Sequence, residues 1–280
     1  MITLDRETGV VNLTIKGPSG DLPLDLKSIE ALGAKYWPLA LARELDDAIL
    51  HLSFNELELG TWVFRSSGDI DNVANVDEVL IKHKDHWLIN EIIQYLKRVL
   101  KRLDLASRSI VALVEPGSCF AGTLLELVFA ADRSYMLDGI IQDSCDYPAV
   151  LLTTEMNFGN LQMCNGLTRL QTRFLNQTEV VKKIYDNRGK KFLAAGAFEL
   201  GMVTFIPDDI DWDEEVRIAI EERASLSPDA LTGMEASLRF AGPETVETKI
   251  FGRLSAWQNW IFQRPNAAGE NGALKLYGTG

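Results

Sequence analysis

The feature that most constrains the fold is one largely apolar stretch, residues 109–137, which reads SIVALVEPGSCFAGTLLELVFAADRSYML. Its first six residues predict a buried strand, Pro116-Gly117 ends that strand, and the run after Gly122 predicts a buried helix. A buried strand joined to a buried helix by a short turn is typical of α/β proteins, in which helices cover a sheet. The helical part carries a single acid, Glu126, and a carboxylate in such apolar surroundings requires a reason.

Periodic patterns predict the elements that surround this strand and helix. Alternating or apolar runs indicate further strands at residues 9–17, 57–68 and 150–156. Amphipathic spacing indicates helices at residues 36–52 and 89–103, and the residues between the second strand and the second helix read as a polar loop. Strands that alternate with helices indicate an α/β arrangement.

The last third of the chain has a different pattern. Beyond residue 192 it is helical and is interrupted by glycine and proline. We therefore expect an α/β core at residues 1–195 and a helical C-terminal region at residues 196–280.

The chain is acidic, with 40 Asp and Glu against 28 Lys and Arg and a formal net charge of −12. This balance argues against binding to nucleic acid or to anionic membranes, which requires clustered basic residues. No apolar run approaches the length of a membrane-spanning helix, and the first residues lack a signal core, so we expect a cytoplasmic protein. The three cysteines, Cys119, Cys145 and Cys164, are far apart and fit free thiols in a reducing compartment.

Several common chemistries lack their motifs in this chain. There is no HExxH or paired CxxC for a metal, and His83 and His86 have only Asp85 between them as a further ligand. The GxSxG turn of serine hydrolases and the glycine-rich loops that bind phosphates or dinucleotides are also absent. The sequence therefore predicts neither a metal nor a nucleotide cofactor.

Two interpretations of Glu126 are open from the residues alone. In the first, the start of the helix leaves backbone N–H groups without helical partners, and the N–H of Thr123 donates to an oxygen that gains negative charge. The turn at Gly68 would supply the second donor of this oxyanion hole, and Glu126 would move protons with a pKa raised by its apolar surroundings. In the second, Thr123 and Glu126 form a capping box, which the composition alone favours.

The stretch IVALVEPGSCFAGTLLELVFAADRSYM resembles a signature of the crotonase (enoyl-CoA hydratase/isomerase) superfamily. In that register the glycines, the glutamate and the later aspartate of the signature fall at Gly117, Gly122, Glu126 and Asp132. The resemblance implies that Glu126 is the first active-site glutamate and that the two glycines contact the substrate. The family's oxyanion-hole glycine corresponds to Thr123, which departs from the family pattern.

A second signature of the superfamily is matched by EMNFGNLQMCNGLTRL, and the resemblance implies that its first residue, Glu155, is the second active-site glutamate. The usual proline before this glutamate is Thr154 here. The family's small-residue loop after the second strand is replaced by RSSGDIDNVANVD, residues 65–77. The resemblance extends over nearly the whole chain. It implies a spiral of ββα units with two roughly perpendicular sheets, a helical C-terminal region, and an acyl-CoA thioester as the substrate.

The C-terminal sequence SLSPDALTGMEASLRFAGPET and the tail after it resemble a ring-cleaving branch of the superfamily that acts on oxidised benzoyl-CoA. Chains of that branch contain two crotonase-like halves, and this chain resembles the second, while the chemistry is expected in the first. The resemblance implies that an epoxidised or dihydrodiol ring is opened by hydrolysis to an unsaturated adipyl-CoA semialdehyde and formate, in aerobic benzoate degradation. No metal or redox cofactor is implied, because CoA is part of the substrate.

Three functions are open at this point. In one, the chain is an active lyase site that uses Glu126 and Glu155. In another, it is a degenerate crotonase fold that serves assembly beside a catalytic half. In the third, it is a stand-alone enoyl-CoA hydratase or isomerase. The departures at Thr123 and in the loop favour the degenerate half for this segment considered alone.

The resemblance also implies association through the C-terminal helices, in a homo-oligomer or with a preceding crotonase-like half. Trp257, Trp260 and Phe262 are candidates for that interface, and packing within their own domain explains them equally well. Lys275 and Arg264, near the tail, are candidates for contact with the phosphates of CoA.

Overall fold

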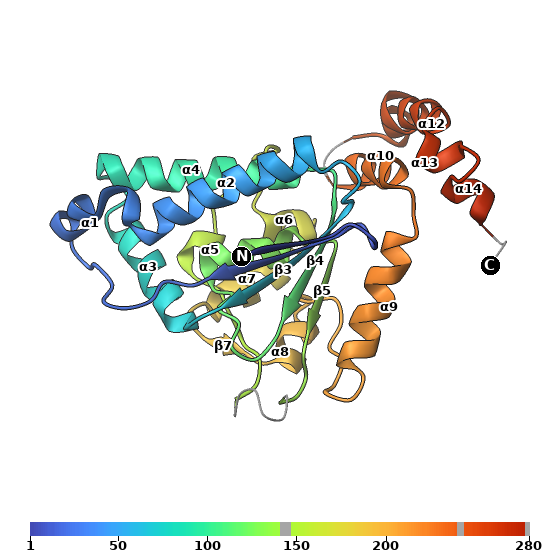
Figure 1. Ribbon diagram of the computed structural model, residues 1–280. Helices are drawn as coiled ribbons and strands as arrows, with labels where there is room; N and C mark the ends of the chain where they lie inside the picture. Colours follow the sequence, from blue (N-terminus) through green and yellow to red (C-terminus); the bar gives the residue numbers. More distant parts are fainter. Residues whose placement is uncertain (141–146, 240–243, 278–280) are drawn as a thin grey trace.

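The structure, a computed structural model, describes residues 1–140, 147–239 and 244–277. At its centre is a five-stranded sheet in which the strands lie in chain order (Figure 1). The first pair is antiparallel and the other pairs are parallel. The strands are β1 (Ile2–Asp5), β2 (Val10–Lys16), β3 (Thr61–Ser67), β4 (Ser109–Val114) and β5 (Arg133–Met136).

The main hydrophobic core lies between one face of this sheet and a group of helices. Trp62, Phe64 and Ile110 point into this core from the strands and are fully buried. Pro38 lies in the first turn of the longest of these helices, where its missing N–H has no helical acceptor to lose. The helices are α1 (Leu26–Leu32), α2 (Trp37–Asn55), α3 (Ile70–Lys82), α4 (Trp87–Asp104) and α5 (Gly122–Ala130).

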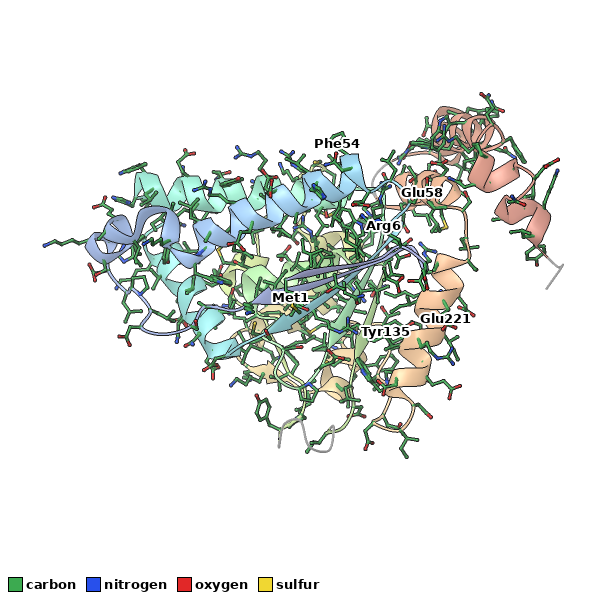
Figure 2. The ribbon with its side chains drawn as sticks, in the orientation of Figure 1. Met1, Arg6, Phe54, Glu58, Tyr135 and Glu221 are labelled. Carbon is green, nitrogen blue, oxygen red and sulfur yellow. The ribbon has the colours of Figure 1, made fainter. Side chains whose placement is uncertain are left out.

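The opposite face of the sheet is covered by α9 (Trp212–Ala224). Val63, Val111 and Tyr135 form a second apolar cluster with Trp212 of that helix. These strand residues alternate with those of the main core, because successive side chains of a strand point to opposite faces. Figure 2 labels Tyr135 between the sheet and α9.

A small second sheet and several short helices lie beside the start of α5. Its two strands are antiparallel, and Leu152 forms a bridge with Ala121, the residue that precedes α5. The elements are β6 (Leu151–Leu152), the 3₁₀ turn η2 (Glu155–Asn157), α6 (Arg169–Arg173), α7 (Thr178–Asp186), β7 (Lys191–Phe192) and α8 (Ala194–Glu199).

The chain ends in a row of short helices that projects from the body (Figure 1). We call residues 244–277 the C-terminal arm. It contacts the body through α10 (Pro228–Leu238), where Gly233 lies so close to Trp257 and Ile261 that a Cβ would be 3.2 and 2.9 Å from them. The arm consists of α11 (Val246–Lys249), a π-helical turn (Ile250–Leu254), α12 (Ser255–Ile261), α13 (Pro265–Ala268) and α14 (Ala273–Leu276).

Most of the predicted elements are confirmed: the strands as β2, β3 and β4, the helices as α2 and α4, and the start of α5 at Gly122. Two predictions are wrong. The expected polar loop is largely the helix α3, whose N-cap is Asp69. The strand expected at residues 150–156 is reduced to β6, because the chain turns into η2.

Two further expectations concern the thiols and the membrane. Cys119 is buried, Cys164 is exposed, and both are free, whereas Cys145 lies outside the described residues. Among the helices of the described segments, none combines the length and the apolar character needed to cross a membrane.

Candidate functional site

Glu126 lies in the interior of the protein, in the second turn of α5, and the residue is 1% exposed. Its Oε1 accepts a hydrogen bond of 2.7 Å from Asn157, and its Oε2 accepts one of 2.8 Å from Arg169. Burial raises the pKa of Glu126, although the charge of Arg169 and the hydrogen bond from Asn157 oppose the shift. Both oxygens of this buried carboxylate are thus engaged by side chains of the chain itself.

Arg169 connects Glu126 to a second buried acid, Asp104 at the end of α4. Its Nε and Nη2 donate to the two oxygens of Asp104 at 3.1 and 2.6 Å, and its Nη1 also donates to the carbonyl of Leu161. The side chains of Arg169, Asp104 and Glu126 are each 1% exposed. Burial also raises the pKa of Asp104, against the charge of Arg169. This arrangement joins α4, α5 and α6 inside the core.

Glu155, the second predicted carboxylate, points outward. It begins η2, and its half-exposed side chain forms an ion pair of 3.2 Å with Arg188. Two residues later the side chain of Asn157 points inward to Glu126. The structure therefore brings the segment of Glu155 close to Glu126 but does not place the two carboxylates in one cleft. In this structure the two side chains face different partners, Arg169 and Arg188, and their catalytic roles stay predictions.

The start of α5 binds a carboxylate that the sequence interpretation did not include. The N–H of Thr123 donates to Oδ2 of Asp77 at 2.9 Å, and its hydroxyl donates to Oδ1 at 2.6 Å. The residue before the helix is Ala121, and no side chain caps the helix locally. The capping box expected from Thr123 and Glu126 is therefore wrong, because Asp77 of α3 supplies the acceptor and Glu126 faces Arg169.

The second predicted oxyanion donor is also engaged within the chain. The N–H of Gly68 donates to the carbonyl of Gly117 at 3.1 Å and so joins the end of β3 to the turn after β4. Both glycines have a positive φ, +144° and +83°, which suits glycine in these turns. The expected pair of free donors at Thr123 and Gly68 is therefore wrong for this structure.

Of the remaining predicted contact residues, one begins α5 and two lie apart from that helix. Gly122, at its start, is covered by Asp77 and Thr154. Arg264 and Lys275 belong to the C-terminal arm, which projects away from α5 in Figure 1. Arg264 donates to Asp229 at 2.7 Å and lies over the ring of Trp260, whereas Lys275 is exposed. The structure does not bring either side chain to the predicted acyl site.

Sequence reasoning missed the residues that occupy the site, Asp77, Asp104 and Asn157. A signal for Asp77 was available, because Ile70, Val73 and Leu80 recur at helical spacing after Asp69, a favourable N-cap residue. Asp104 and Asn157 carry no local signal, since their partners lie 65 and 31 residues away. Taken together, the polar groups around α5 hold helices in place and satisfy one another's hydrogen bonds.

Comparison with known proteins gives a specific relative. No protein-family model matches the chain. The chain is 54% identical to benzoyl-CoA-dihydrodiol lyase from Aromatoleum evansii over 278 residues. The aligned residues cover 99% of this chain and 49% of that protein. The chain thus spans about half the length of this relative.

Solved structures establish the fold. Pseudomonas aeruginosa AtuE superposes with a TM-score of 0.65 at 16% identity, covering 100% of this chain and 96% of the other. An enoyl-CoA hydratase from Geobacillus kaustophilus gives 0.63 at 15% identity, with coverages of 95% and 89%. One from Mycobacterium smegmatis gives 0.63 at 14% identity, with coverages of 95% and 92%. The chain has the crotonase fold, as the two sequence signatures predicted.

Proposed function

We propose that this chain, which has the crotonase fold, is one half of a ring-cleaving lyase that acts on an oxidised benzoyl-CoA thioester. The observation that carries the proposal is the 54% identity to benzoyl-CoA-dihydrodiol lyase along almost the entire chain. Because that relative is about twice as long, a further segment of similar length has no counterpart here. We take that segment to be a preceding crotonase-like half.

The proposed reaction is hydrolysis of the oxidised ring. An epoxidised benzoyl thioester and two water molecules contain the same atoms as an unsaturated adipyl-CoA semialdehyde and formic acid. The carbon atoms therefore exchange oxidation levels among themselves, and the reaction needs no external oxidant or reductant. We accordingly propose that the enzyme works without a redox cofactor and, as the family resemblance implies, without a metal, with CoA as part of the substrate.

Within this enzyme we propose that the present half serves assembly and shape, while the other half supplies the proton transfers. Three observations support this assignment: Glu126 is held by Arg169 and Asn157, Glu155 faces solvent beside Arg188, and the N–H of Thr123 already donates to Asp77. A general acid or base has to come within hydrogen-bond reach of the reacting atoms. In this arrangement, Glu126 and Glu155 do not both come within hydrogen-bond reach of the same reacting atoms.

We propose that the C-terminal arm contacts the other half or a second copy of the chain. The arm carries large apolar side chains on its surface, among them Phe251, Phe262 and Tyr277, which are 77%, 58% and 89% exposed. Trp257 and Trp260 contact each other edge to face, with ring centroids 5.3 Å apart, and Trp257 packs on α10 within the chain. The exposed members of the arm, rather than this tryptophan pair, are the candidates for contact with a partner.

The test uses the two-half enzyme and a ring-epoxidised benzoyl-CoA, with formate release as the measurement. We expect formate from the two-half enzyme and none from the 280-residue chain alone. Glu155→Gln in this half should change the rate by less than about twofold, whereas removal of a general acid or base lowers it by about 10²-fold or more. Absence of formate from the two-half enzyme would contradict the lyase assignment. A large loss on Glu155→Gln would contradict only the assembly role.

The same preparations separate the alternative of a stand-alone hydratase or isomerase. Crotonyl-CoA offered to the 280-residue chain tests that activity directly, because hydration of its double bond changes the ultraviolet absorbance. We expect no turnover. Turnover by the chain alone would replace the lyase proposal with the alternative.

A further inference from the structure

The carboxylate of Asp77 lies at the amino end of α5 and accepts three hydrogen bonds there. Its Oδ2 accepts from the N–H of Thr123 at 2.9 Å and from the hydroxyl of Thr154 at 2.8 Å, and its Oδ1 accepts from the hydroxyl of Thr123 at 2.6 Å. Asp77 is completely buried. The positive end of the dipole of α5 adds to the attraction for a negative charge at this position.

Gly122 makes room for this carboxylate. A Cβ at Gly122 would lie 1.7 Å from Oδ2 of Asp77 and 2.2 Å from Oγ1 of Thr154. The φ of Gly122 is +39°, a conformation that glycine adopts without strain. The start of α5 therefore has room for a carboxylate because residue 122 has no side chain.

Three sequence features that depart from the crotonase pattern meet at this one position. Thr123 replaces a glycine, Thr154 replaces a proline, and Asp77 closes the stretch that replaces the small-residue loop. Separately, each reads as a loss of a family feature. In the structure, both threonine hydroxyls donate to Asp77, so the three changes form one hydrogen-bonded unit.

We propose that the amino end of α5 is a carboxylate-binding seat whose ligand is the chain's own Asp77, which thereby excludes acyl oxygens and small carboxylates from outside. The seat becomes a binding site for a small monocarboxylate once the side chain of Asp77 is shortened. The inference concerns this chain alone and does not depend on the lyase reaction.

The test is size-matched rescue of variants of the 280-residue chain. Asp77→Ala removes one carboxylate group, which formate replaces, and Asp77→Gly removes the methylene as well, which acetate replaces. We expect formate to raise the unfolding midpoint of Asp77→Ala by several degrees with saturating dependence on concentration, because a ligand that binds only the folded state stabilises it. Acetate should act better on Asp77→Gly than on Asp77→Ala. Measurements are made at a pH well above the pKa of Asp77, with chloride at equal ionic strength as the reference.

In two control chains the side chain of residue 77 still occupies the carboxylate-binding seat. The unchanged chain and Asp77→Asn should respond to formate no more than to chloride. If Asp77→Ala does not fold in chloride, refolding in formate should restore soluble, folded chain, and refolding in chloride should not. Equal effects of formate and chloride on Asp77→Ala, or an equal formate response of the unchanged chain, would overturn the proposal. Either result leaves the lyase assignment untouched, because no enzymatic activity is read.

Discussion

At the scale of single residues, the protein shows how differently two neighbouring arginines are used. Arg169 is fully buried and bonds two carboxylates, Asp104 and Glu126. Arg173, one turn later, donates from Nε to the carbonyl of Gly201 at 2.8 Å, and in the described part of the chain no carboxylate pairs with it. Burial without such a partner lowers the pKa of Arg173. Arg169 therefore neutralises two buried carboxylates, whereas Arg173 neutralises none among the described residues.

This difference predicts unequal losses of stability. Arg169→Met leaves two buried carboxylates without their cation and should lower the free energy of unfolding by about 3 to 5 kcal/mol. Arg173→Met, on the same helix, removes one hydrogen bond to a carbonyl and should cost about 1 kcal/mol. Urea unfolding of the three chains measures both losses. Equal losses would show that the ion network contributes no more than an ordinary polar contact.

Asp77 predicts a pH dependence of stability with an unusual sign. Burial raises its pKa from 3.8 to about 6, with the hydrogen bonds from Thr123 and Thr154 opposing and the charge of Glu126 adding to the shift. Between these values the folded chain binds more protons than the unfolded chain, so stability falls as the pH rises, by about 3 kcal/mol in total. Above about 6 this contribution is constant.

Replacement of Asp77 by asparagine should flatten that dependence. Two other groups face Asp77: Glu126, whose own pKa is raised by burial, and Tyr36, which ionises far above this range. A weaker decline with pH should therefore persist in Asp77→Asn. Urea midpoints of both chains, measured from acid to neutral pH, give the comparison. Parallel curves would mean that Asp77 does not hold its proton as its burial implies.

At the scale of elements, the two signatures predicted where α5 begins, and yet they did not reveal what binds there. The start of α5 follows from the turn before Gly122 and the apolar run after it, which are local properties. Its cap is Asp77, which lies 46 residues earlier on α3, a helix read as a loop because its exposed face is rich in Asp and Asn. The failure to predict α3 and the failure to predict Asp77 as the cap of α5 thus have one cause. The helical spacing of apolar residues at positions 70–80 indicates both.

The fit of α5 against α3 predicts a severe effect of a single methyl group. Gly122→Ala should cost about 2 to 6 kcal/mol of unfolding free energy, because overpacking against Asp77 and left-handed strain each contribute about 1 to 3 kcal/mol. Gly166→Ala is the matched control, since φ is +80° there but no atom lies within 4 Å of the new Cβ. It should show only the strain, about 1 to 2 kcal/mol.

A double-mutant cycle tests whether the loss beyond backbone strain comes from the contact between residue 122 and Asp77. In the Asp77→Ala background, Gly122→Ala should cost less than in the unchanged chain, because the nearest clashing atom is gone. The clash with Thr154 persists, so the relief is partial. Additive losses would indicate that Gly122 is needed for its backbone conformation alone.

At the scale of the whole molecule, the crotonase fold was predictable and the state of the site was not. Alternating and apolar runs report which residues face a core, and they placed β2, β3, β4, α2 and α4. The sequence pattern around a glutamate in an apolar helix is the same whether the side chain faces a substrate or an arginine. Glu126 faces Arg169, which lies 43 residues later, and only the tertiary structure brings the two together.

The exposed arm is the feature of the whole molecule that the fold alone does not explain. Phe251 on the arm is 77% exposed, and Phe54 near the end of α2, labelled in Figure 2, is 73% exposed. Phe54 lies on the body, between Ser53 and Asn55 in the chain, whereas Phe251 belongs to the projecting helices together with Leu254 and Phe262. Exposed apolar side chains that form one patch mark contact surfaces, and the arm carries several such side chains on one short segment.

Phe251→Asp and Phe54→Asp form a matched pair that tests this surface in the two-half enzyme or in the 280-residue chain. Both substitutions should change the free energy of unfolding by less than about 0.5 kcal/mol, because both side chains are exposed. Phe251→Asp should weaken association at least about tenfold, since a charge would be buried in an apolar contact, and Phe54→Asp should leave it unchanged. Sedimentation velocity over a range of concentrations measures association. Equal association of all the chains would contradict a partner contact at Phe251.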